Sequence, residues 1–301
     1  MQNNHSDDIK THYRKKREKL YNANKLPRML WIRKCLHPFM IFAVKFARKI
    51  ARQRLFIISD NRSQKNKACV YACSHNGWDD IQMTFEAIRN LAWLFWGNPE
   101  YRTPHYYVLM ANGAICLDSY NKKDRAIAKD TAIKLLRKGQ SLLIYPEGAW
   151  NITPNLPVMK LFSGAADIAI TAGVDIVPVG IIQDGIKDYY LSIGENISTK
   201  NYGAKDKYLL TARLRDKIAT EVWNAMEALP ITKRETLSDN TRQEFEDFLT
   251  SQMNGAFTIE DCENERYHDK GIVETGDAFA HLSSVFLNKN SAFLFNKRNH
   301  D

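Results

Sequence analysis

A histidine followed closely by two carboxylates is the first group of residues in this chain that could do chemistry. The heptapeptide SHNGWDD, residues 74–80, follows an apolar run and places Asp79 and Asp80 four and five positions after His75. Imidazole titrates near neutrality and can take a proton from an alcohol, while a nearby carboxylate fixes its tautomer and stabilises the imidazolium. The segment therefore predicts a general base at the end of a buried strand, where active-site residues are common.

Which aspartate serves His75 depends on the backbone between them. On one continuous helix Asp79 would lie on the His75 face, whereas Asp80 would point about 140° away. If residues 76–78 instead form a turn and a helix begins near Asp79, Asp79 can cap that helix while Asp80 folds back to the imidazole. Both arrangements are open from the sequence.

A second candidate group is a carboxylate at the end of another apolar run. In LLIYPEGAWN, residues 142–151, proline ends the hydrogen-bonded ladder and glycine permits an unusual turn. Glu147 would then lie at a strand end, free to accept hydrogen bonds from hydroxyls of a bound acceptor. The plainer interpretation is a strand-ending turn with a solvated glutamate, and this segment alone does not choose between them.

Both groups fall in a region where short β-rich runs alternate with helical stretches, which is the pattern of a βαβ architecture. The predicted strands are 68–74, 106–110, 114–118, 141–145, 176–182 and 190–197. The predicted helices are 80–91, 123–138, 159–172, 207–228 and one from 238 or 239 to about 252. The predicted fold class is α/β, with a mostly parallel mixed sheet flanked by helices, an N-terminal amphipathic helix pair and a helical C-terminal extension.

The N-terminal region carries the whole basic excess of the chain. Of the net charge of +9, residues 1–55 hold +12, from fifteen Lys or Arg against three acids, and the remainder holds −3. Helical spacing predicts one amphipathic helix from Leu26 to Leu36 and a second that starts at Pro38. The second helix has aromatic residues on one face, and the basic residues on its other face are Lys45, Arg48, Lys49 and Arg52.

A basic amphipathic helix pair suits an anchor at a membrane surface, because aromatic area enters the acyl chains while cations attract anionic lipid. The most apolar run, Pro38 to Val44, is far below the roughly 18–20 residues needed to cross a bilayer. The alternative is an ordinary helix pair packed on the domain with a solvated basic face. Nucleic acid is not an expected partner, because no nucleic-acid module is recognisable and the rest of the chain is acidic.

Composition is that of a globular protein, with 44% hydrophobic and 26% charged residues. The five cysteines form no CxxC pair and suit reduced thiols, and the N-terminus lacks the features of a signal peptide, which favours the cytoplasm. Cys73 lies two residues before His75 on an apolar run, so it is expected to be a small core residue rather than a nucleophile. The sequence contains no Gly-x-Ser-x-Gly elbow that would support a serine acyl-enzyme.

Four blocks, SHNGWDD, GAICLDS, YPEGAWN and IVPVGI, follow one another within roughly residues 67–198. Their order resembles the lysophosphatidic-acid acyltransferase family of glycerolipid acyltransferases. The resemblance implies that His75 is the general base and that Asp80 orients it. It also implies that Glu147, with Gly148 beside it, helps to hold the acceptor. No metal and no resident cofactor are expected, and acyl-CoA or acyl carrier protein would be the co-substrate.

Two positions depart from the family pattern, and both concern the acceptor. Ser119 stands where the family usually has an arginine after aspartate, and Trp150 stands where another arginine often follows the Pro-Glu-Gly motif. Those arginines bind the acceptor phosphate in glycerol-phosphate users, because guanidinium makes paired, charge-assisted bonds to it. The cations nearby that could replace them are Lys122, Lys123, Arg125 and Lys160. An aromatic residue instead favours a bulkier lysophospholipid, a lipid-linked sugar or another amphipathic alcohol.

The predicted activity is transfer of a fatty acyl group from a thioester to a hydroxyl of a lysophospholipid or related lipid. Residues 1–55 would associate with membrane lipids, 56–230 would form the acyltransferase domain, and 231–301 would be an extension of unknown role. The expected location is peripheral, at the cytoplasmic face of the cell membrane. Two other classes stay open: a lipid hydrolase in which the same base activates water, and a non-catalytic protein that binds membrane lipids.

Overall fold

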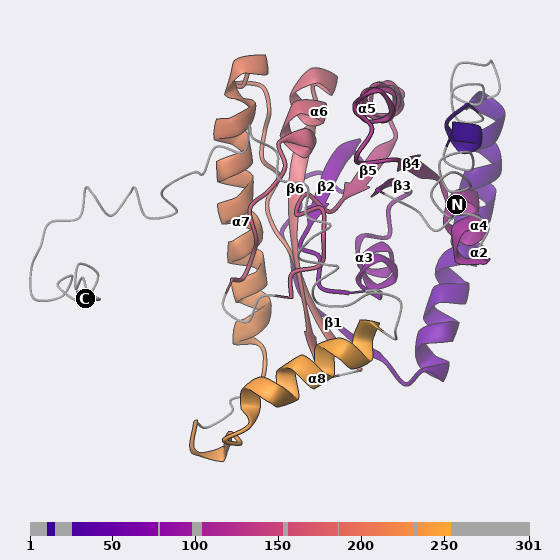
Figure 1. Ribbon diagram of the computed structural model, residues 1–301. Helices are drawn as coiled ribbons and strands as arrows, with labels where there is room; N and C mark the ends of the chain where they lie inside the picture. The colour runs from indigo at the N-terminus through magenta and orange to yellow at the C-terminus, as the bar shows by residue number, and fades with distance from the viewer. Residues whose placement is uncertain are drawn as a thin grey trace, which may run out of the picture.

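The computed structural model describes residues 11–15, 26–77, 79–97, 104–152, 156–185, 187–230 and 234–253. Its strands are β1 Arg54–Asp60, β2 Cys69–Cys73, β3 Ala92–Gly97, β4 Ala114–Leu117, β5 Ser141–Ile144, β6 Asp175–Asp184 and β7 Asp188–Ile193. Its longer helices are α2 Leu26–Ile50, α3 Asp80–Ile88, α4 Pro104–Asn112, α5 Lys122–Arg137, α6 Gly164–Ala172, α7 Lys207–Glu227 and α8 Thr241–Met253 (Figure 1).

The strands form one sheet in the order β1-β7-β6-β2-β5-β3-β4. Among the described strands, every neighbouring pair is parallel except β6 with β7. Those two strands are antiparallel because only residues 185–187 join them, too few for the crossover that parallel strands require. The predicted mostly parallel mixed sheet is confirmed.

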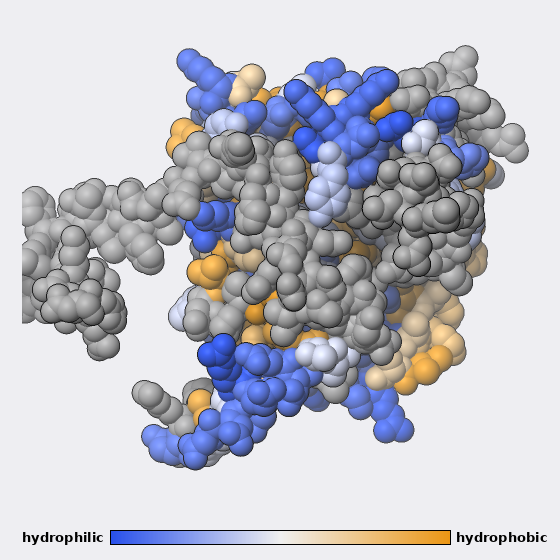
Figure 2. All heavy atoms as spheres, in the orientation of Figure 1, coloured by the Kyte–Doolittle hydropathy of each residue, from blue (hydrophilic) through white to orange (hydrophobic). Residues whose placement is uncertain are grey.

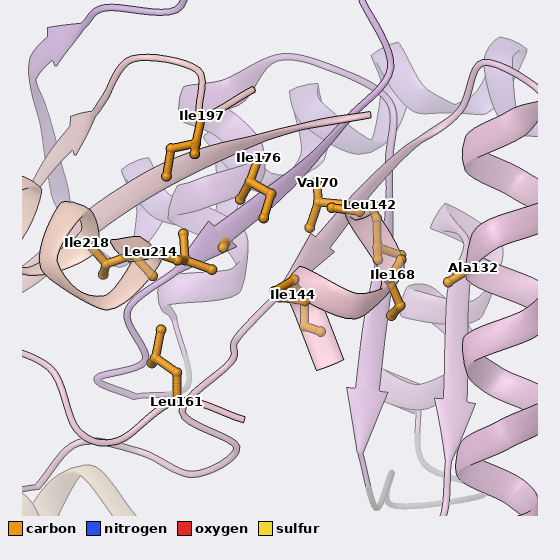
Figure 3. Packing of buried hydrophobic residues seen from close by; sticks show 14 of the residues in the cluster. Val70, Ala132, Leu142, Ile144, Leu161, Ile168, Ile176, Ile197, Leu214 and Ile218 are labelled. Carbon is orange, nitrogen blue, oxygen red and sulfur yellow. The ribbon is translucent and has the colours of Figure 1, made fainter. Parts of the chain in front are cut away.

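Helices cover both faces of this sheet. Side chains alternate along the central strand β2, so Val70 and Ala72 enter one core while Tyr71 and Cys73 enter the other. The first core lies under α5, α6 and α7, and Figure 3 shows part of it, including Leu142, Ile168 and Leu214. The second core lies under α3 and α4. Burial on both faces explains why the central strands read as continuous apolar runs.

The helix α2 is a single helix, so the predicted helix pair with a break at Pro38 is wrong. Pro38 lies on the exposed side of α2. There, a carbonyl group that lacks its usual N–H partner can be solvated, which lowers the cost of a proline inside the helix. Figure 1 shows α2 standing beside α4 at the right of the view.

Two arginines fasten α2 to the rest of the fold. Arg33 is buried, donates to the backbone carbonyls of Asn112 and Ala92, and lies 4.5 Å from the ring centroid of Trp93. In the last turn of α2, Arg48 makes a paired ion bridge to Glu86 of α3, with both N–O distances at 2.9 Å. These basic residues therefore face the domain, not the solvent.

Other predicted elements differ from the structure in instructive ways. The predicted strand 106–110 is wrong, because these residues lie in α4; a short apolar run does not distinguish a strand from a buried helix. The strands β1 and β3 were not predicted, and the predicted boundary between residues 55 and 56 falls inside β1. The C-terminal extension begins with the predicted helix, seen as α8. Its remainder, residues 254–301, lies outside the described part of the chain.

Candidate active site

His75 and Asp80 are brought together by the turn between β2 and α3. The strand ends at Cys73 and the helix begins at Asp80, so the chain between them does not continue as a helix. Asp80 Oδ2 lies 2.7 Å from His75 Nδ1. Of the two arrangements open from the sequence, the structure has the one in which Asp80 folds back to the imidazole.

The Asp80 carboxylate is held by three donors. Besides the imidazole, its Oδ2 accepts the backbone N–H of Asn76 at 2.8 Å and that of Gly77 at 3.2 Å. Its side chain is only 1% exposed, at the N-terminus of α3, where the helix dipole favours an anion. A carboxylate in this position accepts a proton-bearing Nδ1, which leaves the lone pair of His75 on Nε2. The histidine side chain is 16% exposed, so it is not sealed inside the core.

Asp79 occupies the N-cap position of α3, but its side chain makes no capping hydrogen bond. Its Oδ2 instead accepts from Nε2 of Gln53 at 2.6 Å and from the hydroxyl of Tyr189 at 3.2 Å. The expected side-chain cap by Asp79 is therefore wrong. This carboxylate is committed to two partners outside the heptapeptide, so it is not a substitute for Asp80.

Residues 74–79, between β2 and α3, form the histidine loop. Glu147 is completely buried, and it contacts this loop. Its Oε1 accepts the backbone N–H of His75 at 2.9 Å, and its Oε2 accepts that of Met159 at 2.7 Å. The expected free carboxylate at the surface is not what the structure has. Glu147 ties the end of β5 to the histidine loop and to the segment before α6.

Gly148 has a conformational role in the same turn. Its φ of +73° is in the left-handed region that favours glycine, and its N–H donates to the carbonyl of Tyr145 at 3.1 Å. A Cβ at this position would lie 2.4 Å from a ring carbon of Phe162. The glycine thus lets the turn pass beneath Phe162, which accounts for its place in the Pro-Glu-Gly motif without a contact to substrate.

Two aromatic rings flank the imidazole. The Tyr145 ring lies 4.4 Å from the His75 ring between centroids, and the Trp150 ring lies 6.3 Å away, edge to face. The Tyr145 hydroxyl donates to Thr84 at 3.3 Å, and burial raises its pKa well above the usual value, so it stays neutral. Trp150 therefore presents an aromatic surface beside the imidazole.

The candidate acceptor residues lie farther along the same edge of the sheet. Ser119 and Lys122 follow β4, whose carboxyl end points the same way as that of β2 because the strands between them are parallel. Three strand spacings separate β4 from β2, about 14 Å. Asn121 caps α5 here, Arg125 donates to the carbonyl of Ser119, and Lys122 is exposed.

Cys73 is a core residue, as predicted. Its side chain is fully buried, its sulfur lies 3.5 Å from Thr84 Oγ1, and burial raises the pKa of its thiol well above the usual range. A thiol that resists ionisation is a poor nucleophile.

Sequence reasoning missed three residues that contact the site: Tyr145, Gln53 and Tyr189. Tyr145 directly precedes the Pro-Glu-Gly motif, but its closeness to His75 depends on the register in which β2 pairs with β5. Gln53 and Tyr189 carry no motif. Only the folded chain brings them to Asp79.

Comparison with known proteins finds acyltransferases. Residues 54–182 match the family model described as Acyltransferase. A 1-acyl-sn-glycerol-3-phosphate acyltransferase of Borreliella burgdorferi is 28% identical over 126 residues, which cover 38% of this chain and half of that relative. The crystal structure of the 1-acyl-sn-glycerophosphate (LPA) acyltransferase PlsC from Thermotoga maritima superposes with a TM-score of 0.54 at 16% identity, covering 74% of this chain and 97% of that one.

The resemblance drawn from the four blocks is confirmed by these matches, and the structural likeness shows a shared fold. The matched family segment starts at the first residue of β1 and ends within β6. It therefore includes the histidine loop, the β4–α5 turn and the Pro-Glu-Gly turn.

Proposed function

We propose that this chain, with an acyltransferase domain over residues 54–182, moves a fatty acyl group from a thioester carrier to a hydroxyl of a lysophospholipid or related lipid, as a step of phospholipid biosynthesis. The observation that carries the proposal is the 2.7 Å contact between His75 Nδ1 and the buried Asp80 carboxylate within a family-matched segment. The acyl donor would be acyl-CoA or acyl carrier protein.

The proposed chemistry is direct transfer in a ternary complex. His75 Nε2 takes the proton of the acceptor hydroxyl while its oxygen attacks the thioester carbonyl. The tetrahedral oxyanion then collapses, the carbon–sulfur bond breaks, and the imidazolium returns the proton to the leaving thiolate. Asp80 stabilises the imidazolium between these steps. Because the proton taken is the proton returned, the histidine ends each turnover neutral.

The acceptor is proposed to be a lipid alcohol larger than a glycerol phosphate. Trp150 stands where the family often has a phosphate-binding arginine and offers a face on which an apolar group can pack. Lys122 and Arg125, at the same edge of the sheet, would serve an anionic headgroup some distance from the reacting hydroxyl.

Membrane lipids are the proposed environment, with α2 as the contacting surface at the cytoplasmic face. Its docked side holds Arg33 and Arg48, whereas its exposed residues are mostly apolar: Trp31 is 66% exposed, Phe39 72% and Phe42 71%, with Lys34 and Lys49 also exposed. Figure 2 shows hydrophobic residues at the lower right, where the end of α2 lies in Figure 1. An outward aromatic stripe supports interfacial binding over the alternative of a solvated basic face. No helix among the described residues is both long and apolar enough to span a bilayer.

The function is tested by product analysis. Purified full-length protein is incubated with radiolabelled acyl-CoA or acyl carrier protein and a panel of lysophospholipids that differ in headgroup, and the lipids are then separated. Label in one acylated acceptor is the expected result. Free fatty acid without an acylated acceptor would indicate a lipid hydrolase. If neither donor is consumed, the remaining candidate function is that of a non-catalytic protein that binds membrane lipids.

The membrane proposal is tested by liposome flotation with vesicles that contain anionic lipid. Phe39→Ser with Phe42→Ser is expected to reduce the bound fraction severalfold, because these side chains are exposed and their loss leaves the core intact. Leu209→Ser is the matched control, an equally exposed apolar residue on α7. Equal binding by all three proteins contradicts the assignment of α2 as the contacting surface. Removal of residues 1–55 is unsuitable, since it cuts into β1.

A further inference from the structure

Asp79, the residue directly before the orienting aspartate, is anchored from outside the heptapeptide. Gln53 donates its side-chain amide to Asp79 Oδ2 at 2.6 Å, and the buried Tyr189 donates its hydroxyl to the same oxygen at 3.2 Å. Gln53 lies between the end of α2 and the start of β1, and Tyr189 lies in β7. The α2–β1 linker and strand β7, neither of which carries a motif, thus meet at Asp79, the N-cap residue of α3.

The position of Gln53 is itself fixed. Arg48 donates to the Gln53 carbonyl at 2.9 Å and bridges to Glu86, two turns along α3 from Asp79. The Gln53 backbone N–H also closes on the carbonyl of Arg48 at 2.9 Å. The end of α2 and the linker after it therefore contact α3 at two places: Arg48 bonds to Glu86 near the C-terminus of α3, and Gln53 bonds to Asp79 at its N-terminus.

We propose that Gln53 is a positioning residue that acts through Asp79 on the His75–Asp80 pair. Asp80 receives its three hydrogen bonds only if α3 starts in the right direction, and Asp79 is the residue whose backbone sets that start. The inference rests on the proposed function in so far as it concerns rate. A displacement of about 1 Å in a catalytic constellation can cost on the order of 10²-fold in rate, so partial loosening is expected to cost about tenfold.

The kinetic test uses Gln53→Leu, which keeps the side-chain volume and removes the amide. Its kcat is expected to fall about tenfold with KM for donor and acceptor unchanged. The kcat of Asp79→Ala should fall by the same factor. Asp79→Asn should keep most of the wild-type kcat, because its amide oxygen still accepts from both donors. The double variant Gln53→Leu with Asp79→Ala should have the same kcat as Asp79→Ala alone. Gln140→Leu, a half-buried glutamine before β5, is the control.

Wild-type kcat in Gln53→Leu, or additive losses in the double variant, would overturn the inference. If Gln53→Leu does not fold by circular dichroism, Tyr189→Phe replaces it, since it removes only the second donor to Asp79. A loss confined to KM would mean that Gln53 shapes the substrate site instead, and would also overturn the proposal.

A second readout does not require turnover. In protein labelled with ¹⁵N-histidine, the Nδ1–H proton of His75 is assigned by its absence in His75→Ala. We expect its resonance to shift in Gln53→Leu and in Asp79→Ala but not in Gln140→Leu. An unchanged resonance in Gln53→Leu contradicts the inference even if no acceptor is found, whereas a shift in a protein without transferase activity would leave the inference standing and overturn the proposed function.

Discussion

The loop that carries His75 and the turn that carries Lys122 leave the same edge of the sheet, yet their candidate functional side chains lie in different surroundings. Around His75, the buried carboxylates of Asp80 and Glu147 accept four backbone N–H groups between them. Around Lys122, Asn121 Oδ1 and the buried Asp124 carboxylate also accept backbone N–H groups, but the lysine itself is exposed. Both turns are therefore held through their backbones, whereas the candidate base is bound to a buried carboxylate and the candidate acceptor cation lies at the surface.

This difference indicates what can vary without loss of the fold. A carboxylate that satisfies buried N–H groups has no easy replacement, because its removal leaves those groups unpaired. An exposed cation at a capped helix start can change identity at little cost in stability. The chain has Ser119 and Trp150 where the pattern that it resembles often has arginine, beside a His75–Asp80 pair that matches that pattern, which is consistent with this division.

The largest effect is expected from Asp80→Asn. The amide cannot hold Nδ1–H as a carboxylate does, so kcat should fall on the order of 10²–10⁴-fold. Asp79 cannot compensate, because its carboxylate is bound to Gln53 and Tyr189. Steady-state acyl transfer measures the loss, with Asp216→Asn on the outer face of α7 as control. A loss under tenfold would show that the imidazole does not depend on Asp80.

Glu147→Ala tests whether this carboxylate is structural. It leaves the buried N–H groups of His75 and Met159 without acceptors, at about 1–3 kcal/mol each. The denaturant midpoint should therefore fall clearly, with activity lost as the histidine loop loosens. Glu227→Ala, an exposed glutamate of α7, should leave the midpoint unchanged. A normal midpoint with a selective rise in acceptor KM would instead restore the prediction that Glu147 contacts the acceptor.

Trp150→Arg tests whether position 150 belongs to the acceptor site, because it introduces the arginine that often follows Pro-Glu-Gly in the pattern that the chain resembles. A guanidinium beside the base would give an anionic headgroup a charge-assisted bond, worth about 1.5–3 kcal/mol when well formed. The ratio of kcat/KM for lysophosphatidic acid to that for a zwitterionic lysophospholipid should rise about tenfold. An unchanged ratio would place the headgroup away from position 150.

The smallest effect is expected from Lys122→Ala. An exposed cation contributes at most about 1 kcal/mol, so KM for anionic acceptors should rise about two- to fivefold while the melting temperature stays constant. Lys200→Ala, another exposed lysine outside the β4–α5 turn, is the control. If both variants behave alike, Lys122 has no specific role in acceptor binding.

Local features of the site could be predicted from the sequence, whereas contacts between distant segments could not. The His75–Asp80 pair is five residues apart, so a turn was enough to bring them together. The bond from His75 to Glu147 spans 72 positions and depends on the register that pairs Ala72 with Ile144. No residue type reveals that register. The same limit hid Gln53 and Tyr189.

Element types were predicted where periodicity was clear and missed where it was not. The fully buried strands β2 and β5 read as apolar runs with a turn at each end, and the amphipathic pattern of α5 located that helix closely. The run YYVLM, residues 106–110, has the same composition as a strand but lies in α4. Which face of α2 would be exposed also depended on its docking arginines, whose buried partners lie far along the chain.

The most direct test of the account is the rate of acyl transfer by His75→Ala, measured at saturating donor and acceptor against the wild-type protein. We predict a loss of roughly 10²–10⁴-fold, the usual contribution of a general base. Circular dichroism and melting temperature should stay near wild type, because the Asp80 and Glu147 contacts to the loop backbone remain. A variant that keeps the wild-type rate would contradict the assignment of His75 as the base.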